Sequence, residues 1–188
     1  IMLIGFPQLL DKVNEHIDRL DYAREPMNLY EPVKYILALG GKRIRPVMML
    51  MAYNMYRDDV DKILDPALAL EIYHNFTLLH DDLMDNADVR RGKPTVHKRW
   101  DANTAILSGD VMLSLADVYM SRIDDAYFRQ VMATFHQTSI EIAEGQQYDM
   151  DFETRTDVAE QEYIEMIRLK TSVLLACALK IGAILGGA

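Results

Sequence analysis

The sequence predicts an all-α protein, a single bundle of long helices packed side by side. Apolar residues recur at spacings of three and four along most of the chain, which is the period of a helix that buries one face. Glycine is sparse between Phe6 and Lys180, and no alternation of apolar and polar residues persists as a half-buried strand would require. The 188 residues suit one domain, which at this size can bury about 70% of its unfolded surface.

The expected helices follow one another with short connections. Proline in the first turn marks two of the helix starts, at "YEPV" and at "LDPALAL". The segment 87–101 is a longer connection, because Gly92 and Pro94 interrupt the helical period there. Several helices are apolar on more than one face, as in "PVMMLMAYNMY", which indicates an interior position. We predict helices at 7–22, 29–39, 44–57, 65–86, 102–122, 125–150, 157–169 and 171–186.

The charge of the chain argues against nucleic-acid binding and favours a small anionic ligand. The formal net charge is -9, whereas a nucleic-acid-binding surface is broadly basic. Two local basic clusters stand against this acidic background, Lys42-Arg43-Arg45 and Arg90-Arg91-Lys93. Two small basic patches suit a small phosphorylated ligand better than a polyanion.

Cysteine usage and hydropathy predict where the protein works. Cys177 is the one cysteine, which excludes a disulfide framework and fits a reducing compartment. The most apolar stretch, 172–188, carries Lys180 and falls short of a membrane span. We therefore expect a cytoplasmic protein with no stable membrane insertion.

The stretch "LEIYHNFTLLHDDLMD", residues 70–85, sets three aspartates within five residues. On a helix of 3.6 residues per turn, His74, Leu78, Asp81 and Asp85 share one face, whereas Asp82 points about 100° away. Asp81 and Asp85 lie one turn apart, so their carboxylates can share a cation. Hard oxygen ligands with no cysteine nearby favour Mg²⁺ or Mn²⁺ over zinc.

Arg90 and Arg91 follow this acidic helix by five residues. Magnesium held by one or two carboxylates usually completes its shell with water and substrate phosphates. The metal and the two arginines would then converge on the same anionic group. The alternative interpretation is a solvated acidic helix end that is followed by a basic loop.

The stretch "GGKRIRP", residues 40–46, predicts a second phosphate site. Paired glycines free the backbone, and Lys42 and Arg45 then enter the first turn of a helix whose N-terminus favours anions. The alternative is a turn between helices with solvated cations.

Together these motifs resemble those of the trans (E-type) isoprenyl or polyprenyl diphosphate synthases, in a pattern most similar to geranylgeranyl diphosphate synthases. That family carries "GGKRxRP", a His-(x)6-DDxxD helix, "RRG", "GQ" with a nearby aspartate, and a "KT" pair, in this order. Here they stand as "GGKRIRP" (40–46), "HNFTLLHDDLMD" (74–85), "RRGKPTVH" (90–97), "EGQQYDMDF" (144–152) and "KTSVLL" (170–175). The resemblance implies the isoprenoid synthase fold, in which mostly antiparallel helices surround a central cavity.

The resemblance also implies head-to-tail prenyl transfer, in which an allylic diphosphate ionises and isopentenyl diphosphate adds to the cation. Mg²⁺ is expected on Asp81 and Asp85, with Asp82 helping. Arg90 and Lys170 are expected to hold the allylic diphosphate, and Lys42, Arg45, His74 and Arg91 the isopentenyl diphosphate. Thr171 and Gln146 would face the developing carbocation, and Asp149 would support the nearby lysine or the metal shell. The departing pyrophosphate is the expected base.

Product length is expected to depend on the fourth and fifth residues before the first aspartate, which are Thr77 and Phe76. A phenylalanine at the fifth position with a small residue at the fourth resembles geranylgeranyl synthases. We therefore expect a geranylgeranyl product, with farnesyl or a longer chain as neighbours. The resemblance also implies a homodimer that forms through long apolar helices.

One family feature does not occur in this sequence. The family has a second aspartate-rich motif after the "KT" helix, and residues 171–188 do not contain it. Asp149 and Asp151 do not replace it, because they belong to the "GQ" region. We expect residues 1–188 to be a single domain that is incomplete at both ends.

Three other functions compete with prenyl transfer. A non-catalytic helical subunit of a heteromeric synthase would account for the missing second motif. A class I terpene cyclase shares the DDxxD chemistry but does not need a second diphosphate site. The pair His80-Asp81 is comparable with HD-type metal phosphohydrolases, which need further histidines around the doublet. We leave His80, His97 and His136 without a role.

Overall fold

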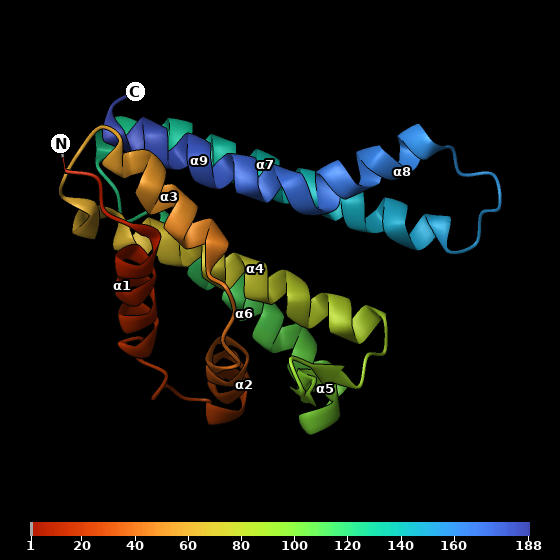
Figure 1. The fold of residues 1–188 in the computed structure, drawn as a ribbon. Helices are drawn as coiled ribbons and strands as arrows, with labels where there is room; N and C mark the ends of the chain where they lie inside the picture. The colour runs from red at the N-terminus through yellow and green to blue at the C-terminus, as the bar shows by residue number, and fades with distance from the viewer. Residues whose placement is uncertain (1) are drawn as a thin grey trace.

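The computed structural model describes residues 2–188, which form a helical bundle with one small hairpin (Figure 1). The helices are α1 (Phe6–Asp18), α2 (Met27–Ala38), α3 (Ile44–Asn54), α4 (Leu64–Met84), α5 (Val96–Arg99), α6 (Ala102–Met120), α7 (Asp125–Phe152), α8 (Glu160–Ile167) and α9 (Val173–Gly186). A 3₁₀ turn η1 (Val60–Ile63) precedes α4, and a π turn η2 (Arg168–Ser172) joins α8 to α9. The antiparallel strands of the hairpin are β1 (Val89–Arg90) and β2 (Lys93–Pro94), with Val89 opposite Pro94.

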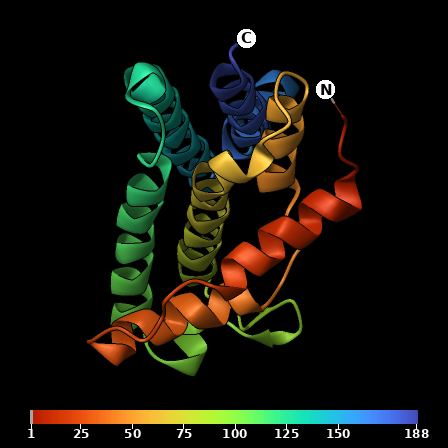
Figure 2. The same ribbon diagram turned by 90° about the vertical axis from the view of Figure 1, so that its left-hand side faces the viewer.

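Two antiparallel helix pairs frame the molecule. α4 and α6 run side by side in opposite directions, and α7 and α9 form the second pair (Figure 1). α3 packs against both α9 and α4, so it joins the two pairs. α1 packs against α3 and α4, and α2 packs against α6, so both helices cover one side of the bundle (Figure 2). The predicted bundle of mostly antiparallel helices is confirmed.

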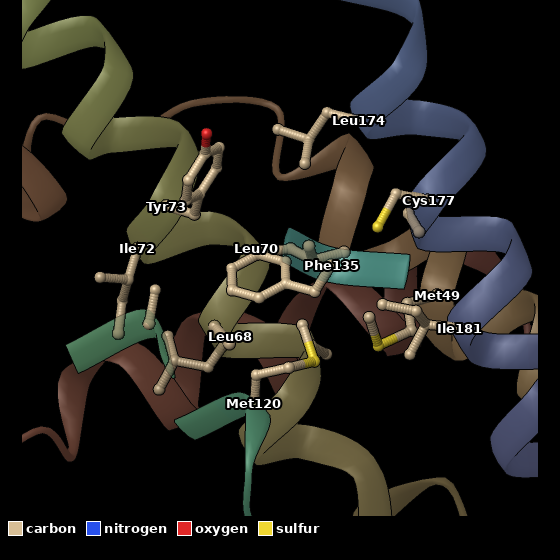
Figure 3. Close-up of a cluster of buried hydrophobic side chains, with 14 of the residues drawn as sticks. Met49, Leu68, Leu70, Ile72, Tyr73, Met120, Phe135, Leu174, Cys177 and Ile181 are labelled. Carbon is tan, nitrogen blue, oxygen red and sulfur yellow. The ribbon is translucent and has the colours of Figure 1, made fainter. Parts of the chain in front are cut away.

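The hydrophobic core lies where α3, α4, α6, α7 and α9 meet (Figure 3). Tyr73 and Phe135 are fully buried, and their rings stack edge to face with centroids 5.4 Å apart. Met49 and Ile181 fill the contact between α3 and α9 (Figure 3). A Cβ atom at Gly182 would lie only 2.2 Å from the carbonyl oxygen of Met49. The close packing of α9 on α3 therefore depends on this glycine.

Most expected helices occur within a few residues of their predicted bounds, and α1 is an exception. It ends at Asp18, four residues before the predicted end at residue 22. Leu20 and Tyr22 still pack against the core from the segment that follows. Their spacing continued the apolar period of α1, although the chain has already left the helix.

Two segments hold structure that the sequence did not predict. The long connection 87–101 contains the β1–β2 hairpin and the short helix α5. The helices predicted at 157–169 and 171–186 form one continuous helix, Glu160–Gly186. No proline or glycine interrupts this helix near residue 170, so the change in its apolar period is absorbed by η2 rather than by a loop.

The continuous helix Glu160–Gly186 is long and apolar enough to cross a membrane by these two criteria alone. The expectation that this region is too short considered only residues 172–188. Within the protein, 56% of the most apolar window is buried, which is how a core helix of a bundle behaves.

Candidate active site

A cavity of about 440 Å³ lies between α4, α6, α7 and η2. Its polar lining comes from α4, α7 and η2 and from the start of α3, and it includes Arg45, His74, Asp81, Gln146, Lys170 and Thr171. Its apolar lining includes Tyr73, Phe76, Leu113, Ile142 and Leu174. The cavity therefore combines charged groups with space for an apolar chain, and it is the central cavity that the fold implies.

Asp81 and Asp85 lie one turn apart at the C-terminal end of α4. The Oδ1 atom of Asp81 is buried, and the Lys170 ammonium lies 3.3 Å from it without a well-aligned hydrogen bond. Burial, followed by the negative charge of Asp81, raises the pKa of Asp85. The C-terminal end of a helix also disfavours negative charge. These carboxylates therefore stand in an unfavourable arrangement that a bound cation would relieve.

The two carboxylates fit a magnesium ion better than a metal that needs a full protein shell. Their oxygens are hard ligands of the type that Mg²⁺ prefers. Within residues 2–188, no group of three or more histidine, cysteine, aspartate or glutamate side chains is arranged to hold a metal. An ion at Asp81 and Asp85 would therefore need water and phosphate oxygens to complete its shell.

Asp82 lies on a different face and pairs with an arginine. Its buried carboxylate accepts two hydrogen bonds from Arg90, from Nε to Oδ2 at 2.7 Å and from Nη2 to Oδ1 at 2.8 Å. A bidentate pair of opposite charges is among the stronger polar contacts in proteins. It fixes the β1–β2 hairpin to α4, and its two charges cancel. Sequence reasoning did not predict this contact, because the hairpin that turns Arg90 back has no periodic signal.

Lys170 projects from the π turn η2 toward both α7 and α4. Its Nζ donates to Oδ2 of Asp149 at 2.6 Å and lies 3.3 Å from Oδ1 of Asp81. Burial lowers the pKa of Lys170, but the hydrogen bond to Asp149 and the charge of Asp81 outweigh it, so the net pKa is raised. The ammonium group is therefore charged at neutral pH, and it links α4, through Asp81, to α7, through Asp149.

A second pocket, of about 320 Å³, lies at residues 39–43 between α2 and α3, the segment that we call the glycine loop. Its lining brings together residues far apart in sequence: Gly41, Lys42, Arg43, Ile44, Arg45, Glu71, His74 and Arg91. Arg91 donates a hydrogen bond to the carbonyl oxygen of Gly40. A Cβ atom at Gly41 would lie 3.0 Å from the Arg91 guanidinium, so the glycine leaves space for it. The loop and the hairpin thus bring their basic residues together around one pocket.

Arg43 differs from its basic neighbours because it is buried. Its Nη1 donates to Oε1 of Glu71 at 2.7 Å, and its Nη2 donates to the carbonyl oxygen of Leu37 at 2.7 Å. Asn75 donates a further hydrogen bond to Glu71. This ion pair fixes the glycine loop to α4 one turn before His74. Sequence reasoning gave Arg43 and Glu71 no role, because nothing in the sequence connects residues separated by 28 positions.

His74 lies beside Arg45, with 3.3 Å between His74 Nε2 and Arg45 Nη1. Burial, then the charges of Arg45 and Arg91, lower the pKa of His74 to about 3. The imidazole is therefore neutral at physiological pH. A neutral ring nitrogen can accept a hydrogen bond from Arg45, and the other can donate to an anion.

This lowered pKa predicts how stability depends on pH. The pKa of an unfolded histidine is about 6.5, so below that pH the unfolded chain binds a proton that the folded chain binds only near pH 3. The contribution of neutral His74 to the free energy of unfolding is therefore complete above pH 6.5, and it is lost as the pH falls toward 3. We expect His74→Gln to reduce the pH dependence of the free energy of unfolding between pH 3 and 6.5, as measured by unfolding in urea. A slope identical to that of the unsubstituted protein would contradict this assignment.

Four further predicted residues line the cavity. Gln146 has a buried Nε2 without a partner, and Thr171 follows Lys170 in η2. Phe76 stacks edge to face on Tyr73, with centroids 5.5 Å apart. The hydroxyl of Thr77 donates to the carbonyl oxygen of His74 and adds little volume to the wall. Phe76 is therefore a bulky side chain that α4 contributes to the cavity wall, together with Tyr73.

Comparison with known proteins identifies the family. The model of the family described as polyprenyl synthetase matches residues 26–188. The chain belongs to the polyprenyl synthetase family. Its membership agrees with the motifs and with the fold, and it does not favour a terpene cyclase or an HD-type phosphohydrolase.

Within this polyprenyl synthetase family, several relatives are geranylgeranyl diphosphate synthases by name. The chain is 46% identical over 178 residues to the geranylgeranyl diphosphate synthase of Methanosarcina mazei, covering 94% of this chain and 55% of that protein. A crystal structure of a geranylgeranyl pyrophosphate synthase matches with a TM-score of 0.94 and 49% identity, over 98% of this chain and 57% of that one. The synthetase from Geoglobus acetivorans matches with a TM-score of 0.92 and 39% identity, over 96% of this chain and 60% of that one. The chain thus spans somewhat more than half the length of these relatives.

Proposed function

We propose that this protein is a trans-prenyltransferase that joins isopentenyl diphosphate to an allylic diphosphate and releases pyrophosphate. The observation that carries this proposal is the lining of one cavity by Asp81 and Lys170 together with apolar side chains. A prenyl diphosphate has the same two parts, a highly charged head and an apolar tail. The names of the relatives support the same activity.

In the proposed reaction, the aspartate side of the cavity binds the allylic diphosphate. Asp81 and Asp85 would hold Mg²⁺, or Mn²⁺ in its place, while Asp82 would act only through Arg90, to which both of its oxygens are bonded. The metal would neutralise charge that develops on the leaving diphosphate. Lys170 would donate to the same diphosphate, and Arg90 would use the Nη1 atom that does not bond to Asp82.

The glycine-loop pocket would bind isopentenyl diphosphate. Lys42, Arg45 and Arg91 supply positive charge, and neutral His74 supplies a directed hydrogen bond. Burial lowers the pKa of Arg45, and its Nε is buried without a partner. A bound diphosphate would supply that partner. Gln146 and Thr171 would then face the carbocation that forms between the two pockets, and the departing pyrophosphate would take the proton.

We propose a geranylgeranyl product, with Phe76 limiting the length of the chain. Phe76→Ala should open the apolar part of the cavity, so we expect the product to lengthen by at least one five-carbon unit. Mass spectrometry of the prenyl products measures this directly. Phe128→Ala is the matched control, since Phe128 is exposed on α7 and does not line the cavity. An unchanged product length with Phe76→Ala would mean that another side chain sets the limit.

The activity itself is tested with the full-length protein. It is incubated with isopentenyl diphosphate, dimethylallyl or farnesyl diphosphate and Mg²⁺, and the products are sized by mass spectrometry. We expect a prenyl ladder that disappears when EDTA removes the metal. A full-length protein that binds both substrates but forms no product would contradict the proposal.

We also propose that residues 1–188 belong to one domain of a cytoplasmic homodimer that does not insert stably into membranes. Packing of α1 against α3 and α4 supports a single domain. Exposed apolar side chains on α6, among them Ile106, Leu107 and Val118, support a contact between subunits. The burial of most of the apolar window in the helix Glu160–Gly186 supports a bundle rather than a membrane span.

A further inference from the structure

The backbone of α7 approaches the π turn η2 unusually closely at Gly145. A Cβ atom at this position would lie 2.4 Å from the backbone nitrogen of Lys170 and 2.8 Å from the carbonyl carbon of Leu169. Contacts below 3.0 Å are essentially never made by real Cβ atoms. Two of the atoms in the way belong to the backbone and the third is the Cβ of Leu169, so no rotation of a side chain could relieve the clash. Any residue other than glycine at position 145 would force the two segments apart.

The contact falls on the irregular part of the helix Glu160–Gly186. Residues Arg168–Ser172 form the π turn, and Lys170 is its central residue. Single π turns inside α-helices are rare and often occur at functional sites. The glycine therefore touches the turn that carries Lys170 and Thr171 into the cavity, whereas the regular helices on either side do not make this contact.

The short distance between α7 and η2 at Gly145 is also the distance that the Lys170 side chain must span to reach α7. Asp149 lies one turn after Gly145 on α7, and its carboxylate accepts the 2.6 Å hydrogen bond from Lys170. The same ammonium group lies 3.3 Å from Asp81 on α4. A single side chain thus reaches two carboxylates on two other helices. Its reach suffices because the backbone of η2 lies directly against α7.

We propose that Gly145 is a positioning residue, which keeps η2 close enough to α7 for Lys170 to reach Asp81 and the diphosphate beside it. The inference rests on the proposed function. It assigns to the glycine of the "GQ" pair a role that is separate from that of the neighbouring glutamine. Gly145 does not itself line the cavity, so it acts through Lys170.

The size of the clash sets the expected effect. An alanine at position 145 needs an ordinary contact of at least 3.4 Å where 2.4 Å is available, so the segments must separate by about 1 Å. A misplacement of about 1 Å can lower a rate about 10²-fold. We therefore expect Gly145→Ala to lower kcat/KM for the allylic diphosphate about 10²-fold, with little change in KM for isopentenyl diphosphate.

Gly182→Ala is the matched control, because it creates a comparable backbone clash elsewhere. Its Cβ would lie 2.2 Å from the carbonyl oxygen of Met49, and Gly182 does not line the cavity. Both variants are made in the full-length protein. Their unfolding is followed by heating, and inorganic pyrophosphate with Mg²⁺ is titrated calorimetrically. We expect both to unfold at lower temperature, but only Gly145→Ala to bind magnesium pyrophosphate about tenfold more weakly. Equal binding losses in the two variants would overturn the proposal and make Gly145 a packing residue.

A second substitution tests the spacing without relying on Gly145→Ala alone. Lys170→Arg keeps the charge but lengthens and widens the side chain. In the protein with Gly145 we expect Lys170→Arg to weaken magnesium pyrophosphate binding. In the protein with Gly145→Ala we expect the longer arginine to restore part of the binding affinity that Gly145→Ala removes. A Lys170→Arg protein that binds as tightly as the unsubstituted one would overturn the proposal even where Gly145→Ala does not fold. A protein that makes no prenyl product would instead overturn the proposed function, while the pyrophosphate titrations still test Gly145.

Discussion

Asp81→Asn is expected to lower kcat/KM for prenyl transfer about 10²- to 10³-fold, comparable to removing one group that stabilises developing charge. The substitution should leave the free energy of unfolding within about 1 kcal/mol of its original value. In the folded protein, the attraction of Asp81 to Lys170 and its repulsion of Asp85 oppose each other, so little net stability is lost. Steady-state kinetics and urea unfolding of the same preparation measure the two quantities.

The neighbouring Asp82→Asn provides the contrasting variant. Asp82 is buried and holds Arg90 through two hydrogen bonds, so its loss leaves an arginine partly buried and without its partner. We expect this change to lower the free energy of unfolding by about 1–3 kcal/mol. If Asp81→Asn and Asp82→Asn reduced stability equally, our distinction between a ligand aspartate and an anchoring aspartate would be wrong.

Glu71→Leu is expected to have the largest effect on stability, about 3–5 kcal/mol, because it leaves a buried cation without a counter-charge. Arg43 is only 5% exposed and Glu71 only 3%, so water cannot replace the lost partner. Chemical denaturation measures the loss. The pair also joins the glycine loop to α4, so we expect KM for isopentenyl diphosphate to rise in the same variant.

Arg43→Met combined with Glu71→Leu separates the two contributions of the pair. Replacing both charges by apolar side chains removes the unpaired cation, and buried pairs replaced in this way often lose little stability. We therefore expect the double variant to recover most of the unfolding free energy while KM for isopentenyl diphosphate stays high. A double variant with normal KM would show that the ion pair stabilises the fold without positioning the loop.

The features that could be predicted from sequence are those set by local geometry. The face shared by His74, Asp81 and Asp85 follows from the period of one helix, and so does the separation of Asp82 from that face. The central cavity was expected only from the resemblance of the motifs to a known family, and not from the period of any one helix. The partners of Asp82 and Lys170 could not be predicted in this way, since they depend on how the chain returns to the same place.

The anchoring contacts show this difference most clearly. Arg43 and Arg45 are two residues apart in one basic cluster, yet Arg43 is buried against Glu71 and Arg45 lines the cavity. Only tertiary packing separates them. The interruption of the apolar pattern near residue 170 was visible in the sequence, but it predicted a gap between two helices. A hydrogen-bonded π turn interrupts the same pattern without ending the helix.

This π turn has a consequence for how the protein tolerates change. One extra residue in a helical turn rotates everything that follows by about 100° relative to an uninterrupted helix. The direction in which Lys170 points from the helix axis is therefore set by its contacts with α7. The direction in which Cys177 and Ile181 point is set separately, by their packing in the core. A single-residue deletion within 168–172 would produce a more regular helix. Such a helix could keep either the contacts of Lys170 with α7 or the core packing of Cys177 and Ile181, but not both. The irregular turn thus lets one continuous helix serve the packing of the bundle and the geometry of the site independently.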